Sequence, residues 1–500
     1  MRRPRILVMG DAMLDVYKHC VGARVSPESP SLIGRLQRTS YFPGGAANVA
    51  SNLATLGARV QFIYVCKSGE SNTLLQNSFP YSPEPVRFTN IEPPVDTSLI
   101  RKTRFVISDK QVFREDLEPA SVSDLYFQKK FYQKVIGVFG EAVREFDPDC
   151  VVLSDYLKGC LVAPETTHYI SQRGGLVFVD TKDKDWRRFT GAFCIKVNQF
   201  EFANVNQYTF EDAKIDERAV LRRFRLGNIV VTRGEEGMSW YGSDIQEMHL
   251  KPEHTNQAVD VTGAGDTVLA ALAYRQAMHS MEKGVETGSR NLPFQEDTLK
   301  FASVAAGIAV SHPGTTSVYG VEVLTKFRGT DGKIFREDSD SIVDLNSLIR
   351  CWKSRNYTIA FTNGCFDLFH TGHMNIINKC SDLADKVVVA INNDESISSL
   401  KGSTRPIVDE VERARLLAAM EVVDAVIIFN SVSPLKMIEL VSPDFLVKGD
   451  DYRESDIIGS SYVRDRGGKV VIIPRVSNNS TTGIISKVFN NHSKNLEGTR

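Results

Sequence analysis

Short apolar runs rich in β-branched residues recur along the whole chain, and segments of helical character separate them. In the first half, these runs are RILVMG (5–10), VQFIYV (60–65), CVVLSD (150–155), LVFVD (176–180), CIKVN (194–198) and NIVVTRG (228–234). In the second half, they are YTIAFTNG (357–364), DKVVVAIN (385–392), AVIIF (425–429), FLVKG (445–449) and KVVIIP (469–474). Such runs suit strands that are buried on both faces of a parallel sheet. Because the strands alternate with helices, the pattern predicts an α/β fold.

One stretch interrupts this alternation. Residues 319–344 include FRGTDGKIFREDSDS, which is polar and charged, contains glycine, and is typical of a linker. The chain has 500 residues, which is too long for one ordinary domain. We therefore expect one domain over residues 1–318, a linker over 319–344 and a second domain over 345–500.

Composition and charge narrow the class of protein. The hydrophobic fraction of 42% and the charged fraction of 24% are ordinary for a soluble globular protein. The formal net charge of -1 gives no overall field that favours nucleic acid or an acidic membrane. The N-terminal apolar run, Ile6 to Met9, is too short for a signal peptide, and no stretch reaches the ~20 apolar residues of a membrane span. The eight cysteines include no C-x-x-C pair, which favours reduced thiols and a cytoplasmic location.

The strongest signal of the first half is DVTGAGDTVLAALAY (260–274), in which small residues precede an Ala-rich helical pattern. Gly263, Ala264 and Gly265 let the backbone approach a ligand, and their N–H groups join the positive end of the helix to form an anion hole. Asp266 would then lie beside the phosphoryl group and take the proton of an attacking hydroxyl. The alternative is a glycine-rich turn in which Asp266 only caps the helix. No G-x-x-x-x-G-K-[ST] motif occurs, so the chain is not a Walker A kinase.

A second glycine motif, FPGGAANVASNLATLGA (42–58), weakens that alternative. Two glycines precede a predicted helix, and an asparagine in its first turn can bind sugar hydroxyls through its amide. The first predicted strand continues into GDAMLD (10–15), and we expect both of its aspartates at the carboxyl end of that strand, where ligands bind in open α/β sheets. Carboxylates suit the binding of neighbouring hydroxyls. These properties favour Asp11, Asp15 and Asn48 as sugar-binding residues, and the family resemblance described next implies the same role for Gly44 and Gly45.

Together these residues resemble the ribokinase-like family of carbohydrate kinases, over about residues 4–318. The resemblance implies a ribokinase-like α/β domain with Asp266 as its catalytic base. The family also has an Asn-x-x-Glu motif associated with magnesium and phosphate, and VTRGEEG (231–237) matches the family's strand and turn beside the nucleotide. The residues that the resemblance implies for ATP and the anion hole are Asn198, Glu201, Thr232, Gly234, Gly263, Ala264 and Gly265.

Within this family, VSPESP (25–30) and LSDYLKG (153–159) resemble the kinase domain of the bifunctional heptose enzymes. A basic segment comprises Arg101, Lys102, Arg104 and Arg114. It could hold a distal sugar phosphate, with Arg104 as the sugar-binding member, or be an ordinary solvated charge run. One departure is Thr181, where the family pattern has proline between an aspartate and a lysine. Loss of the proline is expected to soften that turn without removing a charge.

TNGCFDLFHTGHMNIINKC (362–380) is the most specific motif of the chain. A predicted strand delivers Asn363 and Gly364, and His370 and His373 then open a helix, three residues apart on one face. Imidazolium donors and the helix N-terminus together can stabilise a pentacoordinate α-phosphate. The alternatives are a zinc site, for which the sequence offers neither a convincing third ligand nor H-E-x-x-H spacing, and histidines with only a structural role.

This motif resembles the cytidylyltransferase-like nucleotidyltransferases, over about residues 345–490, and implies a Rossmann-like domain. Further family features are LKGSTRP (400–406), VERARLL (411–417), LVKGDDY (446–452) and NSTTGIISKV (479–488). The resemblance implies that a phosphate oxygen of the sugar attacks the α-phosphorus of ATP, so that no protein nucleophile is needed. Asp450 replaces a glycine of the family motif, which could alter nucleotide affinity. The implied nucleotide-binding residues are Asn363, Gly364, Phe366, Lys401, Arg413, Lys448, Ser480, Thr481 and Thr482.

The order of the two domains is similar to that in the family of bifunctional D-β-D-heptose 7-phosphate kinases / D-β-D-heptose 1-phosphate adenylyltransferases. The resemblance implies phosphorylation of heptose 7-phosphate at O1, removal of the 7-phosphate by a separate phosphatase, and formation of ADP-heptose for the lipopolysaccharide core. It implies ATP and Mg2+ as cofactors, small-molecule sugar phosphates as partners, and a homodimer through the kinase domain. The alternatives are the same architecture acting on another sugar phosphate and a non-catalytic sugar-phosphate sensor, which would have no need of both complete signatures.

Overall fold

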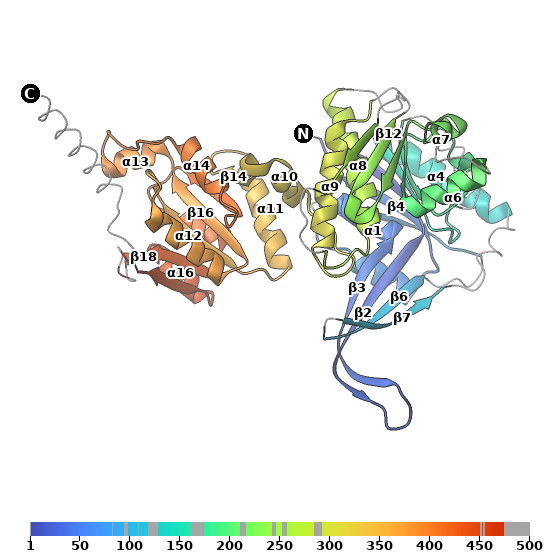
Figure 1. The fold of residues 1–500 in the computed structure, drawn as a ribbon, viewed down its shortest axis with the longest axis horizontal. Helices are drawn as coiled ribbons and strands as arrows, with labels where there is room; N and C mark the ends of the chain where they lie inside the picture. Colours follow the sequence, from blue (N-terminus) through green and yellow to red (C-terminus); the bar gives the residue numbers. More distant parts are fainter. Residues whose placement is uncertain are drawn as a thin grey trace, which may run out of the picture. The chain divides into compact units, whose positions relative to one another are not determined.

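The chain forms two compact units, Met1–Val323 and Leu324–Arg500, in a computed structural model (Figure 1). Each unit has its own sheet and its own covering helices, so the two are described in turn. The described residues are 2–82, 84–94, 99–108, 110–118, 129–161, 175–210, 217–242, 247–252, 258–284, 293–450, 453 and 456–474.

The first unit is built on a nine-stranded sheet with the strand order β13-β12-β11-β10-β9-β8-β1-β4-β5. Its strands are β1 (Arg5–Gly10), β4 (Arg59–Val65), β5 (Arg87–Ile91), β8 (Cys150–Asp155), β9 (Leu176–Thr181), β10 (Cys194–Asn198), β11 (Asn228–Thr232), β12 (Met238–Gly242) and β13 (Glu247–Leu250). The strands from β11 to β5 run parallel, and β12 and β13 continue antiparallel at one edge. The six apolar runs of the first half are confirmed as strands of this sheet.

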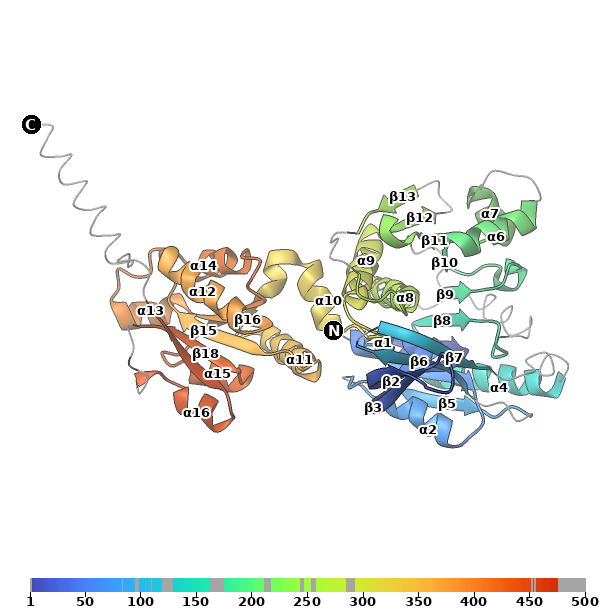
Figure 2. The same ribbon diagram turned by 60° about the horizontal axis from the view of Figure 1, so that its bottom comes forward.

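Helices cover both faces of this sheet (Figure 2). One face carries α1 (Ala46–Leu56), α8 (Ala264–Glu282) and α9 (Glu296–Val310), and the other carries α4 (Lys129–Phe146), α6 (Gln199–Phe210) and α7 (Glu217–Phe224). Alternate strand residues such as Leu7 and Met9 join one hydrophobic core with Phe139 of α4 and Phe202 of α6. Shorter helices are α2 (Glu70–Asn77), η1 (Trp186–Phe189) and η2 (Gly234–Glu236). Burial on both faces explains why the strands read as unbroken apolar runs.

The first unit also contains a four-stranded sheet in the order β3-β2-β6-β7. Its strands are β2 (Ala12–Val25), β3 (Leu32–Gly45), β6 (Ile100–Ile107) and β7 (Lys110–Leu117). The β2–β3 hairpin extends away from the nine-stranded sheet (Figure 1). Several apolar side chains of this sheet are exposed, among them Val25, Leu32, Leu36 and Phe113. Because the strands mix polar and apolar residues, the apolar-run pattern of the sequence did not predict this sheet.

The second unit contains a six-stranded parallel sheet in the order β14-β17-β16-β15-β18-β19. Its strands are β14 (Ile334–Arg336), β15 (Ile359–Gly364), β16 (Lys386–Asn392), β17 (Ala425–Phe429), β18 (Phe445–Gly449) and β19 (Lys469–Ile473). Its helices are α11 (Ser341–Ser354), α12 (Thr371–Leu383), α13 (Asp394–Lys401), α14 (Glu410–Ala418), α15 (Leu435–Val441) and α16 (Ser460–Asp465). The five predicted strands of the second half are confirmed. None of the helices in the described ranges is long and apolar enough to cross a bilayer.

Residues 319–344, which their composition favours as a linker, contain regular structure. They form α10 (Gly320–Phe327), η3 (Gly329–Lys333), β14 and the first turn of α11. β14 pairs with β17, with Ile334 opposite Val426, and Phe335 is buried. A strand as short as β14 contributes only these two apolar side chains to the core. Because charged residues flank them, the sequence shows no apolar run at this place.

Candidate active sites

Both sheets place candidate residues at a point where the strand order reverses. In the first unit, β1 lies between β4 and β8. The chain adds β4 and β5 on one side of β1 and then adds β8 on its other side. Asp11 follows β1 and Tyr156 follows β8. In the second unit, β15 lies between β16 and β18, and Asn363 and Gly364 form its carboxyl end. Ligands of open α/β sheets bind outside the carboxyl ends of the strands at such points.

Asp266 lies in the first turn of α8 and is buried, with 5% of its surface exposed. Gly263 caps the helix with a φ of 78°, a left-handed conformation that favours glycine. A Cβ atom at Gly263 would lie 2.6 Å from Nδ2 of Asn48, and one at Gly265 would lie 2.9 Å from Nζ of Lys196. The small residues therefore bring the helix start against these two polar side chains.

Two side chains hold the Asp266 carboxylate. The Tyr156 hydroxyl donates to its Oδ1 at 2.8 Å, and Nδ2 of Asn48 donates to its Oδ2 at 3.0 Å. Burial raises the pKa of Asp266 to about 6, and the neighbouring Asp180 carboxylate adds to the increase. The two hydrogen bonds and the charge of Lys196 oppose it. Asp266 is consequently ionised at neutral pH and able to accept a proton.

Lys196 and Asp180 form a buried ion pair beside Asp266, from β10 and β9 respectively. Both residues are at most 3% exposed. Sequence reasoning missed this pair and Tyr156 as members of the site. The available signal was a charged residue inside each of two otherwise apolar strands, which is rare unless the charges are paired.

Asp11 and Asp15 have different surroundings. The Asp11 carboxylate accepts the backbone N–H groups of Tyr156, Lys158 and Cys160 at 2.8, 3.0 and 2.9 Å. Burial raises its pKa despite these bonds. Asp15 does not end β1, as the sequence led us to expect, because the chain runs directly from Asp11 into β2, where Asp15 lies.

The structure brings three of the expected sugar-binding residues together on the four-stranded sheet. Asp15 forms a buried ion pair with Arg104 of β6. A Cβ atom at Gly44 would lie 2.6 Å from Oδ2 of Asp15, and the Arg104 guanidinium lies 5.2 Å from the ring centroid of Tyr17. Gly45, with a φ of 57°, is the N-cap residue of α1. Of the other basic residues of this segment, Arg114 pairs with Asp116 on the exposed strand β7.

The Asn-x-x-Glu motif lies at the carboxyl end of β10. Oδ1 of Asn198 accepts the N–H of Glu201 at 2.9 Å, and Oε2 of Glu201 accepts the N–H of Asn198 at 2.9 Å. The other oxygen of Glu201 pairs with Lys182. Carboxylate and amide oxygens are the ligands that Mg2+ prefers, and in this structure both Glu201 oxygens and Oδ1 of Asn198 are bound by protein donors. Thr232 ends the next strand, β11, and its hydroxyl donates to the Val197 carbonyl at 3.3 Å.

Gly234 follows β11 in the turn η2, with a φ of 61°. Thr181, which stands where the family pattern has proline, makes two hydrogen bonds through its side chain. Its hydroxyl donates to Oδ2 of Asp155 at 2.7 Å and accepts the N–H of Asp183 at 3.0 Å. These hydrogen bonds hold the turn in place of the proline ring.

The two histidines of the second unit stand face to face. His370 caps α12, and its Nδ1 accepts the Gly372 N–H at 3.2 Å, which places the proton of its ring on Nε2. The rings of His370 and His373 are 3.9 Å apart with an interplanar angle of 19°. In the described ranges, no group of three or more His, Cys, Asp or Glu side chains could hold a metal ion.

Burial keeps these histidines neutral, in contrast to the expected imidazolium pair. It lowers the pKa of His370 and lowers that of His373 to about 4, with the charges of His370 and Lys401 adding to the second effect. The rings of Phe366 and Phe369 lie 4.8 and 5.7 Å from that of His373. Before a phosphate arrives, the site therefore offers neutral N–H donors.

Lys448 reaches across the reversal point of the second sheet. Its Nζ donates to the Asn363 carbonyl at 2.8 Å, and burial lowers its pKa to about 8. Oδ1 of Asn363 is buried and finds no hydrogen-bond partner among the described residues. The structure thus gathers Asn363, Lys448 and the histidine pair at one end of the sheet.

Arg413, which we expected to bind phosphate, makes several contacts with the protein itself. Its guanidinium, fully buried, donates to the carbonyls of Val408 and Cys365 at 2.9 and 2.6 Å and pairs with Asp394 at 2.6 Å. These contacts brace the loop after β15. Ser480, Thr481 and Thr482 lie outside the described residues.

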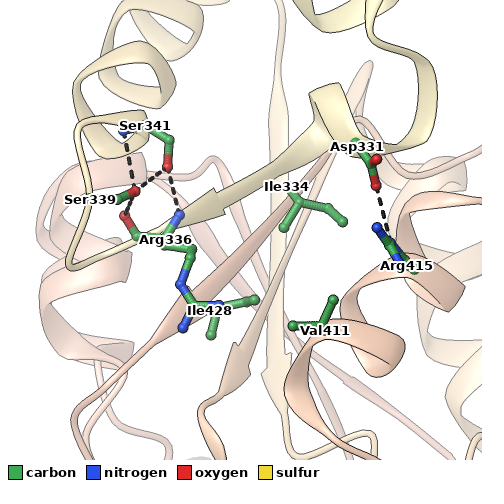
Figure 3. A pocket seen from close by; sticks show the side chains of 8 residues that line it. All are labelled: Asp331, Ile334, Arg336, Ser339, Ser341, Val411, Arg415 and Ile428. Carbon is green, nitrogen blue, oxygen red and sulfur yellow. Dashed lines mark hydrogen bonds and ion pairs between the residues drawn. The ribbon is translucent and has the colours of Figure 1, made fainter.

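A surface cavity of about 270 Å³ lies at the β14 edge of the second unit (Figure 3). Ile334, Val411 and Ile428 contribute its apolar side chains, and Asp331 and Arg415 form an ion pair of 3.2 Å at its side. The residues lining the cavity are Asp331, Ile334, Arg336, Ser339, Ser341, Val411, Arg415 and Ile428. None of these was predicted to bind a nucleotide or a sugar.

Two family models match the chain, in the order that the sites suggest. The pfkB family of carbohydrate kinases matches residues 153–319, and the cytidylyltransferase-like family matches residues 361–479. Phosphofructokinase-2 from Escherichia coli, a solved structure, is 17% identical, with a TM-score of 0.48, over 65% of this chain and 99% of that one.

Curated relatives match both halves at once. The bifunctional protein HldE of Geobacter metallireducens is 36% identical over 493 residues, which cover 97% of this chain and 95% of that protein. HldE of Trichlorobacter lovleyi is 35% identical, with the same coverage. The chain therefore belongs to the family of the bifunctional protein HldE, and it joins a ribokinase-like pfkB carbohydrate kinase domain to a cytidylyltransferase-like nucleotidyltransferase domain.

Proposed function

We propose that the chain catalyses two steps of ADP-heptose formation. The first half transfers the γ-phosphoryl group of ATP to O1 of D-glycero-β-D-manno-heptose 7-phosphate and gives the 1,7-bisphosphate. A separate phosphatase removes the 7-phosphate. The second half transfers the adenylyl group of ATP to heptose 1-phosphate, which gives ADP-heptose and pyrophosphate for the lipopolysaccharide core. The observation that carries this proposal is HldE family membership over 97% of the chain, with both sites in the family's order.

In the kinase step, Asp266 takes the proton of the anomeric hydroxyl as that oxygen attacks the γ-phosphorus. The ionised state of Asp266 above about pH 6 supports this role. The N–H groups of residues 263–265 and the N-terminus of α8 stabilise the charge on the phosphoryl oxygens. Glu201 with Asn198 would hold the water shell of a magnesium ion bound with ATP, and such an ion would neutralise phosphate charge.

In the transfer step, no protein group forms a covalent bond. The 1-phosphate oxygen of the sugar attacks the α-phosphorus in line, and pyrophosphate leaves. His370, His373 and the start of α12 bind the oxygens of the α-phosphate, and Lys448 supplies a cation from β18. The arrival of a phosphate raises the pKa of the histidines and of Lys448, because an anion favours their charged forms. These three side chains are therefore more often positively charged, and attract the phosphate more strongly, once the substrate is bound.

We also propose that two copies associate through the four-stranded sheet of the kinase unit. The exposed Val25, Leu32, Leu36 and Phe113 on that sheet support this, since exposed apolar patches mark interaction surfaces. The enzyme would work in the cytoplasm, where ATP and sugar phosphates are available.

Mass spectrometry of the products tests the whole proposal. The full chain is incubated with heptose 7-phosphate and ATP, with and without an added phosphatase. We expect ADP-heptose when the phosphatase is present and only the bisphosphate when it is absent. A panel of other sugar phosphates tests the alternative of the same architecture with a different substrate, and binding without turnover would indicate a sensor.

A further inference from the structure

The two carboxylate oxygens of Asp266 accept hydrogen bonds from different residues. Oδ2 is held by Asn48, the residue of α1 that we expect to bind the sugar, at 3.0 Å. Oδ1 is held by the Tyr156 hydroxyl at 2.8 Å. An ionised carboxylate has no proton to give, so Tyr156 is the donor in this bond. Oδ2 is therefore the oxygen on the side of the sugar-binding residue.

Tyr156 itself stands on a fixed support. It directly follows β8, and its backbone N–H donates to Oδ2 of Asp11 at 2.8 Å. The same carboxylate accepts the N–H groups of Lys158 and Cys160 and thereby closes the loop into one compact turn. Because Asp11 follows β1, this loop is tied to an interior strand of the nine-stranded sheet. The phenol thus approaches Asp266 from a rigid base.

The ring of Tyr156 has contacts of its own, which are separate from those of the hydroxyl. Nζ of Lys182 lies 5.3 Å and Nζ of Lys102 lies 5.9 Å from the ring centroid. Cations at this distance are attracted to the face of an aromatic ring. A phenylalanine would keep the ring and both cations and would remove only the bond to Asp266.

We propose that Tyr156 is a positioning residue of the kinase step, which holds Oδ1 of Asp266 so that Oδ2 faces the sugar hydroxyl. The inference rests on the proposed kinase function and extends it to the oxygen that accepts the proton. In the step, the sugar O–H bond breaks and its proton passes to Oδ2. The electron pair of the sugar oxygen forms the bond to the γ-phosphorus, while the bond from that phosphorus to the bridging oxygen of ATP breaks and ADP leaves.

Loss of the phenol hydroxyl has a signature in the pH profile. The hydrogen bond from Tyr156 lowers the pKa of Asp266, and so do the bond from Asn48 and the charge of Lys196. Asp180 raises it, and Lys182 also faces Asp266 as a positive charge. With the other groups unchanged, removal of the phenol raises the pKa. Because only the ionised base accepts a proton, the acidic limb of kcat/KM then moves to higher pH.

The test is the full-length variant Tyr156→Phe, assayed for ADP formation with heptose 7-phosphate and ATP. We expect kcat to fall about 10- to 100-fold, the range for a lost hydrogen bond to a charged group, with smaller changes in KM. The matched control is Tyr64→Phe, which removes a hydroxyl bond of 2.6 Å to Asn72 elsewhere in the same unit. That control is expected to keep the wild-type kcat and pH profile.

The outcomes separate this inference from the proposed function. Rates are referred to the folded fraction, measured by circular dichroism, so that a loss of stability alone does not count as a loss of positioning. If the wild-type chain phosphorylates no heptose 7-phosphate, the proposed function fails. If the wild type is active and Tyr156→Phe shares the kcat and pH profile of Tyr64→Phe, the positioning role is overturned. A lower kcat with the acidic limb at higher pH supports it.

Discussion

Burial acts in the same sense on the single residues of both sites, because it favours the neutral form of each ionisable group. It raises the pKa of Asp266 to about 6 and lowers those of His373 and Lys448 to about 4 and about 8. Asp266 remains ionised at neutral pH and is ready to accept a proton. The histidines are neutral until an anionic substrate enters. Asp266 thus carries its charge before the substrate binds, whereas the histidines become charged only when the anionic substrate binds.

Replacement of Asp266 by asparagine separates the two activities. The amide preserves the shape of the side chain and cannot accept the hydroxyl proton, so phosphorylation should fall by about 10²–10⁴-fold. Adenylyl transfer should be unchanged, because its residues belong to the other unit. ADP and pyrophosphate release, measured on one preparation, check both expectations. A kinase rate within a few fold of wild type would exclude Asp266 as the base.

The pH dependence of the kinase follows from the same residue. Protonated Asp266 cannot act as a base, and its pKa is about 6. The kcat/KM of phosphorylation should therefore rise as the pH increases through about 6 and level off above it. The phosphate of heptose 7-phosphate also ionises, so its effect on substrate binding is measured separately and subtracted from the profile. A profile that is flat from pH 5 to pH 7 would contradict the raised pKa.

Alanine at His373 or His370 should stop ADP-heptose formation while the kinase rate stays normal. Removing a preorganised donor to a developing charge typically costs about 10²–10³-fold in turnover. The loss should affect kcat more than ATP binding, and asparagine should be milder than alanine if hydrogen bonding dominates over charge. Pyrophosphate release at saturating substrate, compared with binding of a non-hydrolysable ATP analogue, measures this. Full turnover with loss of a bound metal would instead identify the histidines as ligands.

Sequence reasoning found residues whose roles are local and missed those whose roles depend on tertiary contacts. Gly263 and Asp266 could be predicted because a glycine turn before a helix has its own physical logic. Tyr156 could not, since only the fold brings it to 2.8 Å from Asp266. Arg413 shows a different difficulty. Its position in the sequence suggested phosphate binding, and in the structure its guanidinium donates hydrogen bonds to protein oxygens.

At the scale of elements, most of the central strands were predictable, and most of the exposed strands were not. Strands buried on both faces, such as β1 and β16, are unbroken apolar runs. β3 and β7 are largely exposed, so their sequences carry no such run. β14 is three residues long, below the length at which a pattern can be recognised. Burial on both faces therefore made most of the strands recognisable in the sequence. Two strands depart from this rule: β12 is buried and was not predicted, and the edge strand β19 is partly exposed and was predicted.

The helix α14 offers a direct test of whether Arg413 stabilises the fold. Arg413→Met fills the same space but leaves the carbonyls of Cys365 and Val408 without their donors. We expect a loss of about 2–5 kcal/mol in the unfolding free energy of the second unit, measured by urea denaturation. Arg415→Ala, on the same helix but 60% exposed, should cost no more than about 1 kcal/mol. Equal stability of the two variants, with weaker ATP binding in Arg413→Met, would favour the phosphate-binding role.

At the scale of the whole molecule, the two activities require no shared core. Each unit has its own sheet, its own covering helices and its own reversal point with site residues. The proposed reactions are also not consecutive, because a phosphatase acts between them. Fusion then ensures that equal amounts of the kinase and transferase domains are made, and neither reaction requires it. Separation of the two units is therefore the decisive experiment.

Chain cleavage near residue 330 should leave two working enzymes if the cut respects the second sheet. We expect fragments 1–328 and 329–500 to be soluble, with the kinase in the first and adenylyl transfer in the second. The cut keeps η3 with the second unit, where Lys333 donates to the Val423 carbonyl at 2.7 Å and Asp331 pairs with Arg415. A cut after Ser339 is the control, because it removes β14 and exposes the edge of β17. That second fragment should be less stable and prone to aggregate, as thermal unfolding and light scattering would show. If fragments 1–328 and 329–500 regain activity only on co-expression, the two units share a core and the independence of the domains is wrong.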